Sequence, residues 1–237
     1  MKILVLLLTL SFLSLPVLAD QQWTDETEIG STIVSGNASI ETYNVGDKTS
    51  YQFDQNVFKF MGRYLQSRAN GVESAKNWDA SLRYERDLIA DFSVFVSHGL
   101  SSDIYAGYVQ RNDYDLGGKY FLIKSPETTW SAEVGYRNSF TQFTGPSPNP
   151  QANYLRLYSE ASQVIVEGIA GKLWFEYLPN LSNSDYYLFN AEPSVSVMLN
   201  KLLSLKAADL FKYTNTLPIG FSKHLDSYFT LSLVAKF

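Results

Sequence analysis

The chain has 237 residues and no cysteine, so a disulfide-stapled scaffold and a thiolate metal site are both excluded. Its formal net charge of −5 argues against a nucleic-acid partner, which requires a basic surface. Charged residues make up only 18% of the chain and aromatic residues 15%, which favours a β protein with amphipathic rings at an interface.

The start of the chain has the pattern of a secretory signal peptide. A lysine at the second position is followed by an apolar core over residues 3–15, and the small residues Val17 and Ala19 mark a cleavage site. A proline ends the apolar run before it reaches the roughly 20 residues of a membrane helix. We therefore expect residues 1–19 to be removed after export and residues 20–237 to form one domain.

Beyond this segment, runs of alternating apolar and polar residues predict an all-β, antiparallel transmembrane barrel of about twelve strands, with ten as the alternative count. Successive side chains of an extended strand point to opposite faces, so each run has one apolar and one polar face. The predicted strands cover residues 24–34, 38–45, 51–67, 78–85, 92–97, 113–122, 130–137, 155–160, 172–177, 187–197, 203–213 and 226–237.

The predicted connections alternate in length. Those after the second, fourth, sixth, eighth and tenth strands are tight, at residues 46–48, 87–90, 125–127, 164–168 and 200–202. Those after the odd-numbered strands are longer and include the proline-rich stretch 143–153 and the loop 214–225, except for the short turn Ser35-Gly36-Asn37. Short periplasmic turns that alternate with long extracellular loops are typical of outer-membrane barrels.

Two predicted strands depart from the regular pattern. Pro193 lies inside the tenth strand and lacks a backbone N–H, so it predicts a bulge or a local break in the sheet. Asp209 falls on the apolar face of the eleventh strand, which makes this strand the least regular of the set.

The last strand has the cleanest alternation. Leu231, Leu233 and Phe237 lie on one apolar face together with Phe229, and Phe237 is the final residue of the sequence. An apolar face that ends on an aromatic residue is typical of the closing strand of an outer-membrane barrel. We predict that Leu231, Leu233 and Phe237 are recognised by the barrel-assembly machinery.

Alternation alone leaves the orientation of the two faces open. In a membrane barrel the apolar faces contact lipid, and ring closure pairs every backbone group in a medium without water. In a soluble barrel or sandwich the apolar faces point inward instead. The terminal phenylalanine, the signal segment and the loop lengths favour the bacterial outer membrane, in contact with lipid and lipopolysaccharide.

The polar faces of a membrane barrel line its lumen. The inward residues then include these charged side chains: Arg83, Glu85, Lys119, Glu133, Arg137, Arg156, Glu160, Lys172, Glu176 and Glu192. Among them, the candidate lumen charge cluster consists of Arg83, Glu85, Lys119, Glu133 and Arg137. It is either an ion-pair plug or a ring that sets ion selectivity. Small barrels fill their interior with side chains, whereas open channels are typical of about 16 to 18 strands. The mixed signs favour a plugged or narrow lumen.

No catalytic residue and no cofactor is expected. Outer-membrane lipases use a His-x-Ser pair on one strand face, in which the imidazole activates the serine. The residue two positions after His98 is Leu100, and the residue two positions after His224 is Asp226, with Ser227 one position too far along the chain and on the opposite face. We expect each histidine to be a polar residue near a strand end or in a loop, and the protein not to be an enzyme.

The aspartates offer the best candidate for a metal site. Asp113 and Asp115 share a strand face, and carboxylates are the ligands that Ca²⁺ prefers. Because basic residues lie nearby in the predicted lumen, we expect these aspartates to pair with Lys119 or Arg111 instead and predict no metal.

Several short motifs resemble a known family. The opening Trp23, Glu28 and Gly30, followed by Ser35-Gly36-Asn37, is similar to the start of a family named for salt-induced outer-membrane proteins, a domain of unknown function. The stretches N-W-D-A-S-L-R-Y, L-G-G-K-Y and A-E-V-G-Y-R are similar in order and spacing. The resemblance implies a small barrel of Gram-negative outer membranes and brings no catalytic residues with it.

From these observations we predict a structural or stress-related envelope protein with a plugged or narrow lumen. The alternative is a small channel that selects ions or solutes. An outer-membrane hydrolase is a third hypothesis, which the histidine spacing disfavours.

Overall fold

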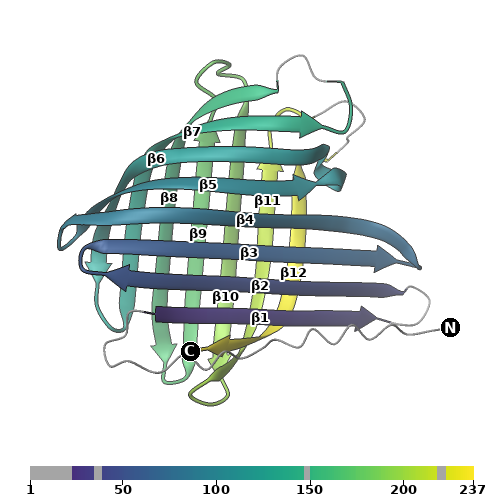
Figure 1. Cartoon of the computed structure of the whole chain (residues 1–237). Coiled ribbons are helices and arrows are strands. Elements are labelled where there is room, and N and C mark those ends of the chain that lie inside the picture. Colours follow the sequence, from purple (N-terminus) through teal and green to yellow (C-terminus); the bar gives the residue numbers. More distant parts are fainter. Residues whose placement is uncertain (1–22, 35–38, 147–149, 218–222) are drawn as a thin grey trace.

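The computed structural model describes residues 23–34, 39–146, 150–217 and 223–237, which form a closed antiparallel barrel of twelve strands (Figure 1). The strands are β1 (Trp23–Val34), β2 (Ile40–Phe53), β3 (Asn56–Ala69), β4 (Val72–Ile89), β5 (Phe92–Asp103), β6 (Tyr108–Lys124), β7 (Thr128–Phe143), β8 (Gln151–Val166), β9 (Ile169–Pro179), β10 (Tyr187–Met198), β11 (Leu203–Thr214) and β12 (Leu225–Lys236). The predicted fold class is confirmed. The predicted signal segment, residues 1–19, and the turn Ser35-Gly36-Asn37 lie outside the described residues.

Each strand pairs with its neighbours in sequence, and β1 pairs with β12 to close the ring. The closing ladder aligns Glu26 with Lys236 and Gly30 with Ser232. It continues through Phe237, whose backbone N–H and carbonyl both bond to Asp25, at 2.9 and 3.1 Å. The last residue of the sequence therefore takes part in closing the barrel.

The two ends of the barrel differ in their connections. One end, here called the terminal end, holds Trp23 and Phe237 together with the tight turns after β2, β4, β6, β8 and β10. The other, the loop end, carries the long connections after β7, β9 and β11 and a short 3₁₀ helix, η1 (Ile104–Ala106), after β5. No helix in the described ranges is long and apolar enough to cross a membrane.

Two predicted connections were wrong. Gly46 and Asp47 lie in the middle of β2, where they pair with β1 and with β3, so the predicted turn there does not exist. The chain turns instead after Phe53, at Asp54, whose φ is 49°. The connection after β3 is tight rather than long, since Asn70 and Gly71 both adopt positive φ, as a two-residue hairpin requires. Pairing on both sides of β2 outweighed the local turn preference of Gly-Asp.

The two irregular strands keep their register. Pro193 pairs with Leu173 of β9, but the ladder to β11 skips from Ala191 to Ser194 without a shift. The proline therefore causes a local break and not a bulge. Asp209 points outward and accepts a hydrogen bond from the Ser227 hydroxyl at 2.7 Å.

Most apolar residues of the strands face out, and most charged residues in the middle of the barrel face in. Leu82 and Leu116, both within long strands, are 64% and 60% exposed, whereas Glu133 and Arg156 are only 4% and 6% exposed. A soluble barrel would have the opposite arrangement, because its apolar side chains leave water on folding. The inversion is that of a transmembrane barrel.

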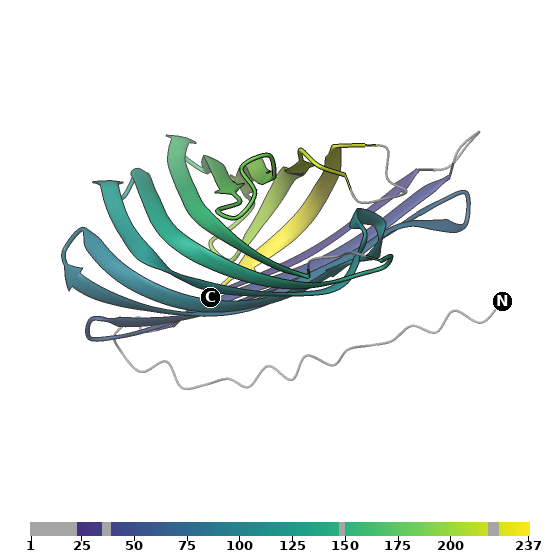
Figure 2. The ribbon, with the colours of Figure 1, turned by 90° about the horizontal axis from the view of Figure 1, so that it is seen from above.

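The lumen lies between two curved walls. In Figure 1 the wall formed by β1 to β7 lies in front of the wall formed by β8 to β12, and Figure 2 shows the strands from above as they curve round the interior. The strands of the two walls cross in Figure 1, as expected when every strand is tilted relative to the barrel axis. Inward side chains of both walls therefore meet in the lumen.

Candidate functional site: the charged lumen

Alternating arginines and carboxylates form a connected network in the lumen. This central lattice consists of Arg83, Glu133, Arg156, Glu176, Arg137 and Asp115. Glu133 accepts two hydrogen bonds from Arg83, at 2.8 and 3.0 Å, and one from Arg156 at 2.6 Å. Glu176 accepts from Arg156 at 2.7 Å and from Arg137 at 3.0 Å. Arg137 donates twice to Asp115, at 2.6 and 2.8 Å.

Two features position this lattice: the inward faces of five strands and a buried aromatic ring that packs against Arg83. Its residues come from β4, β6, β7, β8 and β9, always from the inward face. The guanidinium of Arg83 lies 3.7 Å above the ring of Phe95, which is buried. Gly117 leaves the space for that ring, since a Cβ there would lie 2.8 Å from Phe95 Cζ. Phe95 thus supports the lattice from below.

A second group of charges adjoins the lattice on the side of the terminal end. The carboxylate of Glu85 lies 2.8 Å from Lys59 Nζ, 2.6 Å from Arg83 Nε and 4.0 Å from Lys119 Nζ. Glu85 therefore connects two lysines to Arg83 and, through it, to the lattice.

The structure places all five residues of the predicted charge cluster in the lumen. Three belong to the central lattice, and Glu85 and Lys119 lie beside it. Alternation also predicted that Arg156 and Glu176 face inward, but the predicted cluster did not include them, although they link its members. The ladder positions that join them depend on strand register, which alternation does not reveal.

The lattice side chains are largely buried, from 3% exposed at Glu133 to 16% at Arg83. Burying a charge is costly unless it is paired and its hydrogen-bonding groups are satisfied. Each lattice carboxylate accepts hydrogen bonds from at least one arginine, and Glu133 and Glu176 each bridge two. This arrangement places a chain of ion pairs in the middle of the lumen, and each pair depends on its neighbours.

One contact joins opposite walls near the loop end. Asp103, at the end of β5, is completely buried and lies 3.2 Å from both Lys212 Nζ of β11 and the Tyr228 hydroxyl of β12. In the strand order of the ring, β5 and β11 are on opposite sides. Asp103 also accepts a hydrogen bond from the Ala106 backbone at 3.0 Å, which fixes η1 over the same place.

A second contact crosses the lumen between β3 and β10. Arg63 Nη1 lies 3.6 Å from the carboxylate of Glu192, and the same guanidinium donates to Asp79 at 2.7 Å. Lys206 lies 3.5 Å from the other oxygen of Glu192 and 3.0 Å from Glu28. Side chains of both walls therefore meet at two separate places within the lumen.

The histidines take no part in this network. His98 faces outward in the middle of β5 and stacks on Tyr114, with ring centroids 4.5 Å apart, so its predicted place near a strand end was wrong. His224 precedes β12 and its Nδ1 lies 2.8 Å from the Thr214 carbonyl oxygen. Across the described ranges, no group of three or more His, Cys, Asp or Glu side chains could hold a metal ion.

The predicted partners of the two aspartates were also wrong. Asp115 pairs with Arg137, which lies directly opposite it on the ladder between β6 and β7. Asp113 accepts a hydrogen bond from the Ser139 hydroxyl, its own ladder partner. Arg111 lies 4.2 Å above the Tyr108 ring. Cross-strand neighbours decided these contacts, not neighbours along the chain.

The residues proposed for assembly recognition lie on the outer face of β12. Leu231, Leu233 and Phe237 are all exposed, whereas the intervening Ser232 and Val234 are buried. The predicted faces of this strand agree with the structure, and recognition by the assembly machinery stays a prediction.

Residues 27–237 match the family described as "Protein of unknown function, DUF481". The chain belongs to this family. The resemblance to a domain of unknown function is thereby confirmed, while the link to salt induction stays a prediction. No curated protein sequence matches the chain.

Solved structures of similar shape include porins and autotransporter domains. The NanC porin is 8% identical with a TM-score of 0.49, covering 90% of this chain and 97% of its own. The KdgM porin is 11% identical with a TM-score of 0.47, covering 91% and 98%. The translocator domain of the autotransporter NalP from Neisseria meningitidis is 11% identical with a TM-score of 0.45, covering 91% and 87%. Likenesses at this level transfer no function.

Proposed function

We propose that the protein is a non-enzymatic barrel of the bacterial outer membrane whose lumen is closed at rest. The observation that carries this proposal is the contact of Asp103 with Lys212 and Tyr228 across the ring. Together with the bridge from Arg63 to Glu192, it joins walls that an open pore would hold apart. Its role is then structural or stress-related within the envelope.

The architecture supports this location. The outer wall is apolar, the strand number is even, and most long connections lie at one end, as in outer-membrane barrels. We propose that residues 1–19 direct export and are cleaved, that the terminal end faces the periplasm, and that the loop end faces lipopolysaccharide.

Conductance of the refolded mature protein in a planar bilayer tests the closed lumen. We expect silence at high and low salt from protein shown to be folded and inserted. A combined variant, Arg83→Ser, Glu133→Ser and Arg156→Ser together with Asp103→Ser and Glu192→Ser, removes the middle of the lattice and both contacts across the lumen, so it should conduct. The matched control, Leu82→Ala, Val134→Ala and Leu155→Ala together with Val94→Ala and Val195→Ala, changes outward residues on the same strands and should stay silent.

A narrow channel is the second candidate, favoured by one observation. The side chains of Lys59 and Lys172 remain 33% and 36% exposed although both face the lumen and form ion pairs. Water thus reaches part of the interior near the terminal end. Stable, ion-selective conductance steps from the unaltered protein would overturn the closed lumen and establish the channel. In that case, reversed ion selectivity of the Lys59→Glu variant would identify Lys59 as a residue that lines the pore.

The assembly hypothesis can be separated from barrel closure. Deleting Phe237 should lower the amount of folded protein in the outer membrane, but the deletion also removes its two backbone hydrogen bonds to Asp25. Phe237→Ala keeps the backbone and removes only the ring, so it should reproduce the defect if the ring is recognised. Phe229→Ala, another outward phenylalanine of β12, is the control. Normal membrane levels of Phe237→Ala would contradict recognition of the ring.

A further inference from the structure

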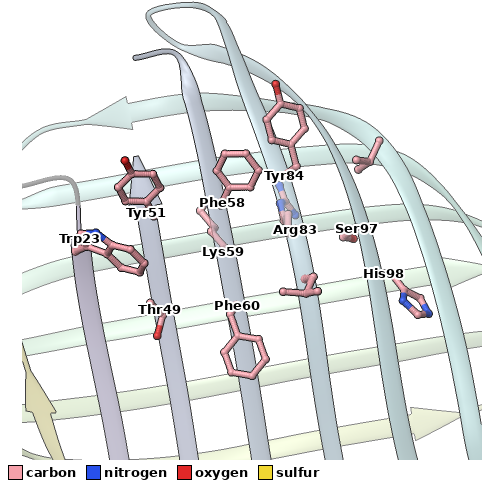
Figure 3. A pocket seen from close by; sticks show the side chains of 12 residues that line it. Trp23, Thr49, Tyr51, Phe58, Lys59, Phe60, Arg83, Tyr84, Ser97 and His98 are labelled. Atoms are coloured by element: carbon pink, nitrogen blue, oxygen red, sulfur yellow. The ribbon is translucent and has the colours of Figure 1, made fainter. Parts of the chain in front are cut away.

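The outer wall of the barrel contains an apolar groove that is separate from the lumen. It has a volume of about 570 Å³ and crosses the outward faces of β1 to β5 (Figure 3). The main residues around it are Tyr51, Phe58, Phe60, Leu82, Val96 and His98. Lys59, Arg83 and Ser97 also border it, but their polar groups bond to Glu85, Glu133 and Asp115 inside the barrel. The groove surface is therefore almost entirely apolar.

Aromatic pairs form its walls on the side of the terminal end. The rings of Trp23 and Tyr51 lie 4.7 Å apart, and those of Phe58 and Tyr84 lie 5.1 Å apart. Figure 3 shows these rings standing on neighbouring strands around the groove. Aromatic residues with a polar edge are common where a membrane meets water, so this part of the groove lies at the level of lipid headgroups.

The groove extends from the terminal end to about the middle of the barrel. Trp23 is the first residue of β1, whereas His98 lies midway along β5. The hydrocarbon core of a bilayer is about 30 Å thick, so half of it corresponds to one leaflet. A groove of this reach fits an acyl chain from the leaflet at the terminal end.

Two carboxylates adjoin the groove on the outer face. The Thr49 hydroxyl, which lines the groove, is placed to donate to either Asp25, at 2.9 Å, or Asp47, at 3.1 Å. Neither aspartate forms an ion pair with any side chain in the part of the chain that the structure describes. A carboxylate that faces lipid is costly, and a cationic headgroup would complement it.

We propose that this groove binds one phospholipid with an ammonium headgroup, of the phosphatidylethanolamine type. Its acyl chain would lie over Phe60, Leu82 and Val96, and its ammonium group beside Asp25 and Asp47. This site rests on the proposed membrane location but not on whether the lumen conducts.

Native mass spectrometry of detergent-purified barrel mixed with phosphatidylethanolamine or phosphatidylglycerol tests the site. Val96→Trp fills the groove, and Val134→Trp makes the same change on the outward face of β7, outside it. We expect Val96→Trp to reduce the lipid-bound fraction at least about tenfold, the effect of losing contact with roughly two methylene groups. Equal retention by the two variants, or no retention by the unaltered protein, would overturn the site.

The headgroup assignment has its own variant. The unaltered barrel should retain phosphatidylethanolamine in preference to phosphatidylglycerol, and the double variant Asp25→Asn, Asp47→Asn should lose this preference while still binding lipid. Equal retention of the two lipids by the unaltered protein would overturn the ammonium assignment. Liposome flotation of each protein tests the proposed membrane location separately. A protein that does not insert into membranes would not float with the liposomes, whatever its lipid binding in detergent.

Discussion

The inner and outer faces of the barrel are built from consecutive residues but depend on different forces. On β8, Arg156 points inward and bonds to Glu133 and Glu176, while Leu155 beside it points to lipid. The charged side chains of the inner face stabilise the barrel only together, since removing one of them leaves its partners buried and unpaired. The outer face consists of largely independent apolar contacts. We therefore expect a strand to tolerate substitutions on its outward side better than on its inward side.

The largest expected effect comes from breaking the lattice at its centre. Arg156→Met leaves Glu133 and Glu176 each short of a partner and should lower the free energy of unfolding by about 3–5 kcal/mol. Leu155→Met, its outward neighbour, should cost less than about 1.5 kcal/mol. Urea unfolding in lipid vesicles, followed by tryptophan fluorescence, measures both. Similar values for the two variants would contradict the difference between the faces.

A charge placed on the outer face should cost nearly as much. Leu82→Arg puts a cation on the lipid-facing surface of β4 and should destabilise the barrel by about 2–4 kcal/mol if Leu82 lies near the middle of the membrane. Leu202→Arg makes the same change in a turn at the terminal end, where the cost should be about 0–1 kcal/mol. The same unfolding assay compares them, and equal costs would show that Leu82 does not face hydrocarbon.

Adding a single methyl group at Gly117 tests how tightly the residues around Phe95 pack beneath the lattice. A Cβ on Gly117 would lie 2.6 Å from the Val134 carbonyl oxygen and 2.8 Å from Phe95, so Gly117→Ala should cost about 1–3 kcal/mol. Gly99, also in a strand, has only ordinary contacts at 3.7 Å, and Gly99→Ala should be close to neutral. Thermal unfolding on gels resolves this difference, and a neutral Gly117→Ala would refute the tight packing around Phe95.

The smallest effect is expected for an ion pair outside the lattice. Lys236 lies 3.3 Å from Glu26 at the terminal end, but its side chain is largely exposed. Lys236→Met should change stability by less than about 1 kcal/mol, because water and salt screen such pairs. Lys206→Met removes a buried lysine held by Glu28 and Glu192 and should cost more. Unfolding at low and high salt separates the two, with salt dependence expected only for the Lys236 pair.

The sequence predicted the faces of the strands better than their ends. The inward orientation of Glu133, Arg137 and Arg156 followed from alternation and agrees with the structure. The turn predicted at Gly46 and Asp47 did not exist, because a turn signal is local and strand pairing on both sides overrode it. Partners within the lumen were predicted least well, because register decides them.

The sequence alone determined that the chain forms strands with one apolar and one charged face, because a period of two is a property of the extended backbone itself. Only the tertiary structure decided that the lumen is bridged. Asp103 and Lys212 are 109 positions apart, and no local pattern relates them. They meet because ring closure sets β5 opposite β11, and the distance between two walls depends on the tilt and register of all the strands together.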